Sequence, residues 1–340
     1  MIARLRMAAA ALLLSAGACS YQHYQSTFSD AAVEARQFNI LFVIFLVVCA
    51  VMYALVITFL IAGIARRRRS QANVMEEGRH HESDPLMGTG LIGWGALVAT
   101  GLVGLAIASF FTDRSMASAA ARPKLLVTVT AKQWWWDVRY EAGDKSKTFH
   151  TANEIHLPVG VPAQIVLQSD DVIHSFWVPS LAGKQDLIPG RVNDISITPT
   201  RVGIYRGQCA EYCGAEHAKM ALTVDVDSYG DFLNWWRHQL QSAPPPATPL
   251  ATAGYNFVTS RNCSACHAIA GTPANGTVGP DLTHLASRRS IAAGAMPMSE
   301  GNLYGWVADP QSIKPGNHMP TIGMEPDQLH AVIAYLKTLK

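Results

Sequence analysis

The most informative segment of this 340-residue chain is GQCAEYCGAEHAKM, residues 207–220. It contains four potential metal ligands at successive spacings of four, four and three residues: Cys209, Cys213, His217 and Met220. Thiolate, imidazole and thioether groups are soft ligands that suit copper, and the thioether in particular argues against a structural zinc site. A mononuclear blue-copper site uses one thiolate, whereas two thiolates four residues apart can bridge two copper ions. The segment therefore predicts a copper centre, with structural zinc as the alternative.

Short β-rich runs surround this motif from Lys124 to about Asp227. They are LLVTVTAKQWWWDVRY, EIHLPVG, AQIVLQS, DISITPT and ALTVDV. Turn residues separate the runs, which favours an all-β sandwich or barrel. The following segment, DFLNWWRHQL, is typical of a short helix.

The copper motif resembles the dinuclear CuA site of cytochrome c oxidase subunit II. The segment DDVIHSFWVPSLAGKQDLIPGR, residues 170–191, resembles a second part of the same family. The resemblance implies a cupredoxin-like CuA domain over residues 124–240. It implies copper ligation by the side chains of His174, Cys209, Cys213, His217 and Met220 and by the backbone carbonyl of Glu211. It also implies that the Glu211 carboxylate binds magnesium at the contact with subunit I, the alternative being a solvated surface glutamate.

The run KQWWWDVRY resembles the aromatic patch of this family. The resemblance places Trp134 at the surface position where electrons enter from cytochrome c. Tryptophans that alternate along a strand more often fill a sandwich core, and we expect that structural role for Trp136.

A second motif, CSACH, supplies Cys263, Cys266 and His267 in the C-x-x-C-H pattern of covalent haem attachment. The alternative is a thiol redox pair. The segments GPDL, from Gly279, and ADPQSIKPGNHMP resemble class I cytochromes c, which implies an all-α domain over residues 254–340. In it, His267 and Met319 would be the axial ligands, a pair that raises the haem potential. Met296, Met298 and Met324 are competing sulfur ligands.

The segment QSAPPPATPLATA, residues 241–253, joins these two domains. Prolines favour an extended, semi-rigid chain of about 3.1 Å per residue. We therefore expect a linker over 241–253.

The composition indicates a membrane protein, because only 15% of residues are charged while 49% are hydrophobic. Uncharged stretches of 29 and 28 residues lie between Arg36 and Arg66 and between Asp84 and Asp113. A helix of about 20 apolar residues spans a bilayer core. The region 36–112 therefore predicts a two-helix transmembrane hairpin, with helices at about 38–64 and 88–111. Glycines in the second stretch favour close helix packing.

The orientation follows from the run Arg66 to Arg69, because excess arginine marks the cytoplasmic side. The loop 65–87 is then cytoplasmic, and the N-terminus and both soluble domains lie outside the cell membrane. Residues 1–19 are typical of a signal peptide. They resemble a bacterial lipoprotein signal in which Cys19 becomes lipidated, ordinary cleavage nearby being the alternative. We expect Cys49 to be a buried thiol within the first helix, and no disulfide.

A net charge of +2 disfavours nucleic-acid binding. The combined domains resemble subunit II of caa-type haem-copper oxidases in the bacterial inner membrane. The resemblance implies electron transfer from haem c through CuA to haem in subunit I, where oxygen is reduced and protons are pumped. It implies subunits I and III as partners, and cytochrome c or another one-electron donor.

Three other functions compete with that of an oxidase subunit. A nitric oxide reductase with CuA in its small subunit is the alternative. A copper-delivery lipoprotein would need neither covalent haem nor paired thiolates, and a quinol oxidase lacks these copper ligands. One feature departs from the family: the second helix starts as PLMGTGLIGWG, without the glutamate that many relatives carry at a proton path.

Overall fold

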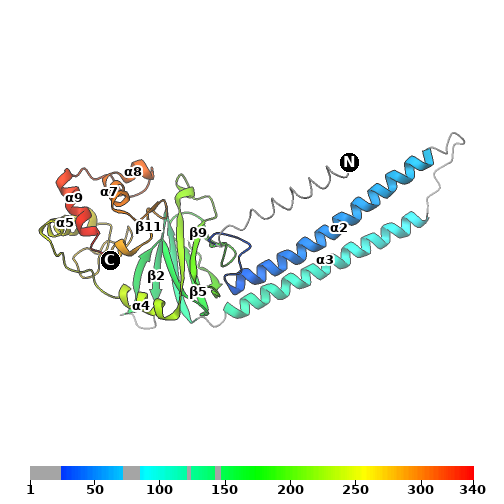
Figure 1. The fold of residues 1–340 in the computed structure, drawn as a ribbon, viewed down its shortest axis with the longest axis horizontal. Helices are drawn as coiled ribbons and strands as arrows, with labels where there is room; N and C mark the ends of the chain where they lie inside the picture. The colour runs from blue at the N-terminus through cyan, green and yellow to red at the C-terminus, as the bar shows by residue number, and fades with distance from the viewer. Residues whose placement is uncertain (1–23, 72–84, 121–123, 142–146) are drawn as a thin grey trace, which may run out of the picture. The chain divides into compact units, whose positions relative to one another are not determined.

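The computed structural model describes residues 24–71, 85–120, 124–141 and 147–340. The predicted signal peptide over residues 1–19, including Cys19, lies outside these ranges. The described residues form two compact bodies, of which one lies within residues 37–118 and the other comprises the described residues on either side of that range. Figure 1 shows the elements of each body.

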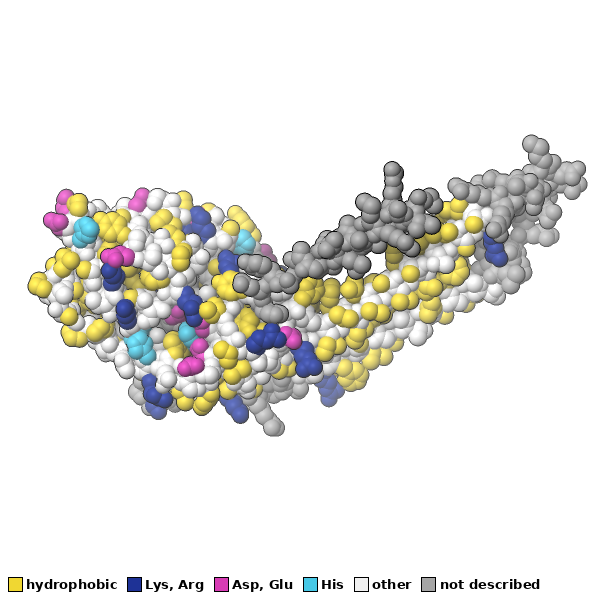
Figure 2. Space-filling view, viewed as in Figure 1, with side chains coloured by type: hydrophobic (Ala, Val, Ile, Leu, Met, Phe, Trp, Pro, Cys, Tyr) yellow, Lys and Arg dark blue, Asp and Glu magenta, His cyan; other side chains and the backbone are white. Residues whose placement is uncertain are grey.

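Two long helices, α2 (Val33–Gln71) and α3 (Pro85–Ala120), lie side by side (Figure 1). The ring centroids of Phe59 on α2 and Trp94 on α3 are 5.9 Å apart in an edge-to-face contact. Val33–Arg66 and Gly88–Ser115 are long and apolar enough to cross a membrane. Their hydrophobic side chains are exposed along the helix pair (Figure 2). The two apolar helices that the sequence predicts are therefore present. Cys49, expected to be buried, is exposed on α2, which has few neighbours within the chain.

The central domain is a sandwich of two five-stranded sheets, which confirms the predicted cupredoxin-like architecture. The first sheet has the order β3-β2-β1-β5-β8, and its strands are β1 (Leu125–Lys132), β2 (Trp135–Glu141), β3 (Phe149–Ala152), β5 (Ala163–Ser169) and β8 (Asn193–Ile197). The second has the order β4-β10-β9-β6-β7, and its strands are β4 (Glu154–Pro158), β6 (His174–Trp177), β7 (Gln185–Leu187), β9 (Gly203–Cys209) and β10 (Ala221–Asp227).

The core lies between the sheets because side chains alternate along each strand. On β1, Val127, Val129 and Ala131 are fully buried, and β1 pairs antiparallel with β2 and parallel with β5. Trp136 on β2 is also fully buried, in the structural role expected for it. Helix α4 (Tyr229–Gln239) packs Trp235 against aromatic rings at the rim of this core.

The strand register in the second sheet determines which residues lie together at one edge of that sheet. Strands β6 and β9 are antiparallel neighbours, with Phe176 opposite Cys209. His174 at the start of β6 and Cys209 at the end of β9 therefore lie at the same edge of the sheet.

Residues 24–36 pack on the sandwich, a contact that the sequence did not predict. The Thr198 amide donates to the Glu34 carboxylate over 2.9 Å, and Ala32 forms a β-bridge with Pro199. The start of α2 is therefore held by the same domain that carries the metal site.

The C-terminal domain is mainly helical, as predicted. Its elements are α5 (Pro249–Thr259), α6 (Arg261–Ser264), η3 (Leu285–Ser287), α7 (Glu300–Ala308), α8 (Pro310–Ile313) and α9 (Pro326–Leu336), with a minimal hairpin of β11 (Ser290–Ile291) and β12 (Met296–Pro297). Helices α5 and α9 cross closely at Gly254, where a Cβ would lie 1.9 Å from the Ala331 carbonyl oxygen. Only glycine permits this crossing.

Helix α5 begins inside the predicted linker 241–253. Thr248 caps it, since its hydroxyl accepts a hydrogen bond from the Ala251 amide, and Pro249 occupies the first turn. A proline at this position fits a helix start as well as an extended chain, which is why composition alone placed the boundary too late.

Candidate functional site

The sulfur-rich site forms where two strands of the second sheet end. His174 opens β6, and Cys209 closes β9. The chain then turns through residues 210–216 into the short helix η2 (His217–Lys219), after which Met220 leads into β10. The strands therefore fix two of the side chains, and a short loop tied at both ends fixes the others.

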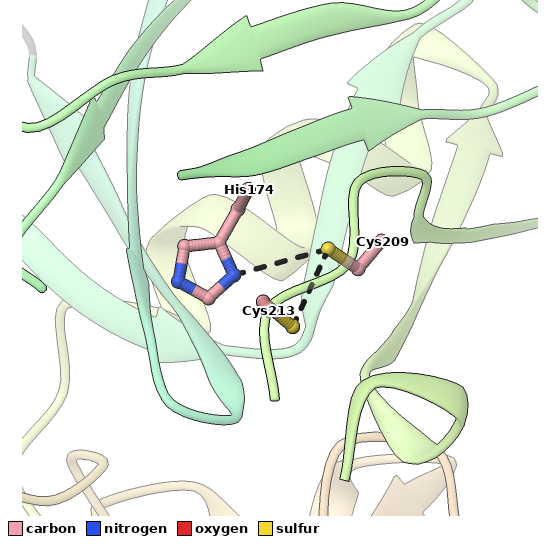
Figure 3. Close-up of side chains that lie close together, drawn as sticks. All are labelled: His174, Cys209 and Cys213. Carbon is pink, nitrogen blue, oxygen red and sulfur yellow. Dashed lines mark hydrogen bonds between the residues drawn. The ribbon is translucent and has the colours of Figure 1, made fainter. Parts of the chain in front are cut away.

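All six donors expected for copper come together around this loop and the two strand ends. Cys209 Sγ lies 3.8 Å from Cys213 Sγ, 3.8 Å from Nδ1 of His174 and 3.1 Å from the Glu211 carbonyl oxygen. Cys213 Sγ lies 3.6 Å from Nδ1 of His217 and 3.8 Å from Sδ of Met220. Each thiol therefore faces one imidazole nitrogen, and Figure 3 shows His174 pointing at the sulfur pair.

Asp171 forms a hydrogen bond with the ring nitrogen of His174 that does not face Cys209. Its Oδ1 accepts a hydrogen bond from His174 Nε2 over 2.8 Å, which leaves Nδ1 free to face Cys209. Burial acts to raise the pKa of Asp171, but hydrogen bonds from His174, the Val172 amide and the Gln133 amide outweigh it and lower the pKa. Asp171 is therefore an ionised partner that fixes the orientation of the His174 ring, as the outer hydrogen-bond partner of a metal-binding histidine would.

The two thiols are buried and hydrogen-bonded to each other. The pKa of Cys209 is lowered, first by its hydrogen bond with Cys213, and the pKa of Cys213 is raised by the same contact. In the absence of metal the pair thus holds one proton, whereas a metal would displace it because thiolate is the ligating form.

This donor set fits two copper ions better than one zinc ion. Structural zinc takes four cysteine or histidine ligands around one centre. Here two soft thiolates stand between two imidazoles, and a thioether and a carbonyl oxygen complete the set. The thioether of Met220 is only 1% exposed and is directed at Cys213. The arrangement suits a centre that accepts and donates single electrons with little movement of its ligands.

A second site lies in the C-terminal domain, in a cavity bounded by the CSACH motif. His267 Nδ1 donates to the Pro280 carbonyl oxygen over 2.7 Å, and burial lowers the pKa of His267. The imidazole is therefore neutral, with Nε2 available to an iron ion. Gly279 packs against this ring, because a Cβ there would lie 2.6 Å from His267 Cε1.

One of the four candidate methionines lines the cavity. Met319 lines it together with Cys263, Cys266 and His267, whereas Met296, Met298 and Met324 are not among its lining residues. The loop around Met319 is held by hydrogen bonds, since Gln311 Nε2 donates to its carbonyl and its amide donates to Asn317 Oδ1, each over 2.8 Å. The cysteines, the histidine and this methionine fit a covalently bound haem with two axial ligands.

Trp134 lies between the two sites. Its indole Nε1 donates to the Cys213 carbonyl oxygen over 2.9 Å, and its side chain lines the cavity that contains His267. Trp134 is only 8% exposed. The expectation of a surface position is therefore wrong for this chain, because the C-terminal domain covers the indole.

The sandwich supplies part of the haem cavity, which no motif in the sequence indicates. The lining residues from the sandwich are Gln133, Trp134, Trp135 and Asn153. Two supporting residues were also missed. Asp171 could have been found from its position three residues before His174, whereas Lys314, whose amine reaches the sandwich, has no local signature.

Glu211 contributes its carbonyl oxygen to the sulfur cluster, while its side chain is exposed. The only hydrogen bond recorded for the carboxylate among the described residues is from the Tyr212 amide, over 3.2 Å. The carboxylate therefore faces outward from the sulfur cluster.

Comparisons with known proteins match the two domains that contain these sites to families. The family described as cytochrome c oxidase subunit II, periplasmic domain, matches residues 125–227, and the cytochrome c family matches residues 251–340. Cytochrome c oxidase subunit 2 of Bacillus sp. (strain PS3) is 30% identical over 297 residues, covering 81% of this chain and 80% of the relative.

A second relative, cytochrome c oxidase subunit 2 of Alkalihalophilus pseudofirmus, is 34% identical over 232 residues, covering 68% of this chain and 66% of the relative. Among solved structures, the periplasmic domain of subunit II of cytochrome oxidase (CoxB) of Bradyrhizobium japonicum is similar, at 28% identity and a TM-score of 0.33. That match covers 35% of this chain and 96% of the solved chain.

Proposed function

This chain belongs to the cytochrome c oxidase subunit II family and has a fused cytochrome c domain, and from that premise we propose that it transfers electrons from haem c, through the dinuclear copper site, to haem in subunit I. Family membership implies copper and haem c as cofactors and subunit I as a partner. We further propose that oxygen is reduced and protons are pumped in the assembled complex.

The observation that supports this path is the position of Trp134. One side chain lines the haem cavity and donates a hydrogen bond to the backbone of a copper-ligand residue, Cys213. When bound, haem iron and paired copper each take up and release single electrons. The residues around them hold the ligands in fixed positions and exclude water, which limits rearrangement during transfer.

The ligand roles follow from the donor geometry. We propose that His174, Cys209, Cys213, His217, Met220 and the Glu211 carbonyl hold the copper pair. Cys263 and Cys266 would form thioethers to haem, and His267 and Met319 would be its axial ligands. Trp134 is the proposed point where electrons enter the copper domain, from the attached haem in the intact chain.

Glu211 is also the proposed magnesium ligand at the contact with subunit I. Magnesium prefers carboxylate oxygens, and the Glu211 side chain is exposed rather than used inside the sulfur cluster. Metal analysis of Glu211→Gln in the assembled oxidase tests this assignment. The variant should lose magnesium and retain copper.

The proposed location is the bacterial inner membrane, with the N-terminus and both soluble domains on the extracytoplasmic side. Cys19 is the proposed lipid attachment site, exposed as the first residue when the signal sequence that precedes it is removed. Subunit III and a cytochrome c or other one-electron donor complete the proposed partners. Labelling from outside intact cells should reach a cysteine added near Ser242 and should not reach one added near Arg69; the reverse pattern contradicts this topology.

The decisive experiment measures metal and haem content in the purified complex and records its electron paramagnetic resonance spectrum. We expect two copper ions sharing one unpaired electron when oxidised, and one covalent haem in this subunit. Cys209→Ser should abolish the dinuclear spectrum, because a hydroxyl cannot replace a bridging thiolate. A single zinc ion would refute the copper assignment, and turnover with nitric oxide but not oxygen would identify the alternative enzyme.

A further inference from the structure

Lys314 places its amine at the contact between the cytochrome c domain and the sandwich. The side chain is buried, and Nζ donates to the carbonyl oxygens of Trp134 over 2.7 Å, Lys219 over 2.9 Å and Ala292 over 3.1 Å. The first two acceptors belong to the sandwich and the third to the cytochrome c domain. An ammonium group has three donors, and all three are used here.

The contact is reciprocal. Lys219 Nζ, in the sandwich, donates to the Ile313 carbonyl oxygen over 2.8 Å, while Lys314 donates to the Lys219 carbonyl. Lys219 directly precedes Met220, and Lys314 begins the loop that carries Met319. The two lysines thus join the loop of a copper ligand to the loop of a haem ligand.

The loop that begins at Lys314 and carries Met319 also lies against the indole of Trp134. A Cβ built on Gly316 would be 3.8 Å from Trp134 Cη2, so the loop passes over the ring that bonds to Cys213. Lys314 holds the backbone of the same tryptophan. Trp134 is therefore held at its indole nitrogen by the loop that carries Cys213, and at its ring and its backbone carbonyl by the loop that carries Met319.

A turn in the cytochrome c domain, residues 292–294, also takes part in the contact with the sandwich. Ala292, Ala293 and Gly294 have φ values of 53°, 58° and 78°, in the left-handed region. Alanine adopts this conformation only where its surroundings enforce it. The Ala293 carbonyl accepts a hydrogen bond from the Ala221 amide of the sandwich over 2.9 Å, and the Ala292 carbonyl accepts from Lys314.

Two arginines also reach the sandwich, but they are weaker candidates for setting the contact. Arg289 pairs with Asp225 over 2.8 Å, yet its side chain is 53% exposed, and exposed ion pairs contribute little. Arg288 is buried, but its distance to Glu154 is 4.0 Å and it also lines the haem cavity. Lys314 differs because all its bonds are short, buried and directed at backbone on both sides.

From these contacts we infer that Lys314 is a positioning residue for electron transfer: it docks the cytochrome c domain so that Trp134 lies against both cofactor sites and is closed to external donors. This inference rests on the proposed electron path. The path then depends on a buried amine outside both ligand sets. Soluble donors reach the copper domain only when the contact between the cytochrome c domain and the sandwich around Lys314, here called the dock, opens.

The dock does not depend on one protonation state. Burial lowers the pKa of Lys314 to about 7, while Glu216 acts in the opposite direction. An ammonium has three N–H donors and a neutral amine has two. With two donors and three acceptors, two of which belong to the sandwich, Lys314 can keep at least one bond to a sandwich carbonyl in either form.

Lys314→Met in the assembled oxidase tests the inference with a readout that does not require turnover. The Ala221 amide bonds across the dock, whereas the Thr223 amide, two residues along the same strand, bonds to Asn153 within the sandwich. Hydrogen exchange of Ala221 should accelerate by about tenfold or more, because buried carbonyls lose their donors. Exchange of Thr223 should not change.

A kinetic readout tests positioning rather than packing. After rapid reduction of haem c, electron transfer to copper in Lys314→Met should slow by about tenfold, since small displacements of reacting groups cost large factors in rate. The haem and copper spectra should be unchanged. Trp134 should also become open to oxidative labelling and to direct donation by added soluble cytochrome c.

The matched control is Lys337→Met. Lys337 pairs with Glu300 inside the cytochrome c domain and is 46% exposed. It should alter neither Ala221 exchange nor the transfer rate. Lys219→Met is a second test variant if Lys314→Met fails to assemble, because Lys219 is partly exposed and its loss removes one bond across the dock. It should change both readouts in the same direction by a smaller factor.

Two failures can be told apart. If the unmodified oxidase transfers no electrons from haem c to copper, the proposed function fails. If it does transfer them, and Lys314→Met (or Lys219→Met in its place) leaves Ala221 exchange and the transfer rate unchanged, only the positioning role is overturned.

Discussion

The indole nitrogen of Trp134 donates a hydrogen bond of 2.9 Å to the carbonyl oxygen of Cys213. The same oxygen accepts a second bond from Gln133 Nε2 over 2.7 Å. Two consecutive residues before β2 thus hold the loop that carries Cys213 by its backbone. The indole then continues into the wall of the haem cavity.

Trp134→Phe should slow electron transfer from haem c to copper while leaving copper bound. The substitution removes one hydrogen bond, worth about 0.5–1.5 kcal/mol of stability, and Gln133 still holds the Cys213 carbonyl. Flash reduction with optical detection of both cofactors measures the rate. Trp135→Phe is the control, because Trp135 lines the cavity and contacts Lys132. Equal rates in the two variants would remove Trp134 from the path.

Asp171→Asn should weaken copper binding. Asp171 orients His174 from behind through a 2.8 Å hydrogen bond, and the loss of such outer partners typically costs about 10–100-fold in metal affinity. Competition with a copper chelator, followed by electron paramagnetic resonance, measures the change. Asp170→Asn is the matched control, because Asp170 is 57% exposed and pairs with Lys132. An unchanged affinity in Asp171→Asn would show that His174 needs no such partner.

Gly279→Ala should disturb haem ligation. A Cβ at this position would lie 2.6 Å from His267 Cε1 and 2.9 Å from Nδ1, closer than side chains approach. The imidazole must move and weaken its bond to the Pro280 carbonyl. The haem spectrum and haem content per subunit report the change, and Gly301→Ala, which meets nothing within 4 Å, should leave both unaltered. Normal haem ligation in Gly279→Ala would contradict the packing described here.

The sandwich should lose stability as the pH rises through the folded-state pKa of His156. Burial acts to lower the pKa of His156, but the hydrogen bond to Asp227 and the charges of Glu154, Asp225 and Asp227 raise it above 6.5. Trp235 stacks on the ring. Because the folded state binds this proton more tightly, the stabilisation is complete below pH 6.5 and is lost as pH rises through the folded pKa.

Urea unfolding at pH values on both sides of this range measures the effect. Asp227→Asn should flatten the pH dependence. Asp137→Asn is the control, because its partner His150 is more exposed and lies on another strand pair. An identical pH profile for Asp227→Asn and the unmodified chain would exclude His156 as the source.

Much of the fold was readable from local pattern. Apolar runs longer than a bilayer predicted α2 and α3, and β-rich runs between turn residues predicted the sandwich. The boundary between the linker and the C-terminal domain was placed at residue 254, after the start of α5, because Pro249 suits either a linker or a first helical turn. Residues 24–36 were missed because their contacts with residues 198–200 depend on sequence positions far apart.

The sequence predicts the parts of the site whose residues are close together in the chain. It does not predict contacts between residues that are far apart in the chain. Cys209, Cys213, His217 and Met220 lie within twelve residues, and the C-x-x-C-H motif is continuous. Lys314 contacts Trp134, which is 180 residues away, and nothing in the spacing of either residue signals that contact. The expectation of an exposed Trp134 was wrong for the same reason, since the cover comes from another domain.

The haem cavity, one wall of which belongs to the sandwich, has a thermodynamic consequence. Solvent exposure and dielectric surroundings tune the reduction potential of a haem. Separation of the domains would replace Gln133, Trp134, Trp135 and Asn153 with water along that wall. The midpoint potential of this haem is therefore a property of the whole chain, and a value measured on the isolated cytochrome c domain would describe a different redox centre.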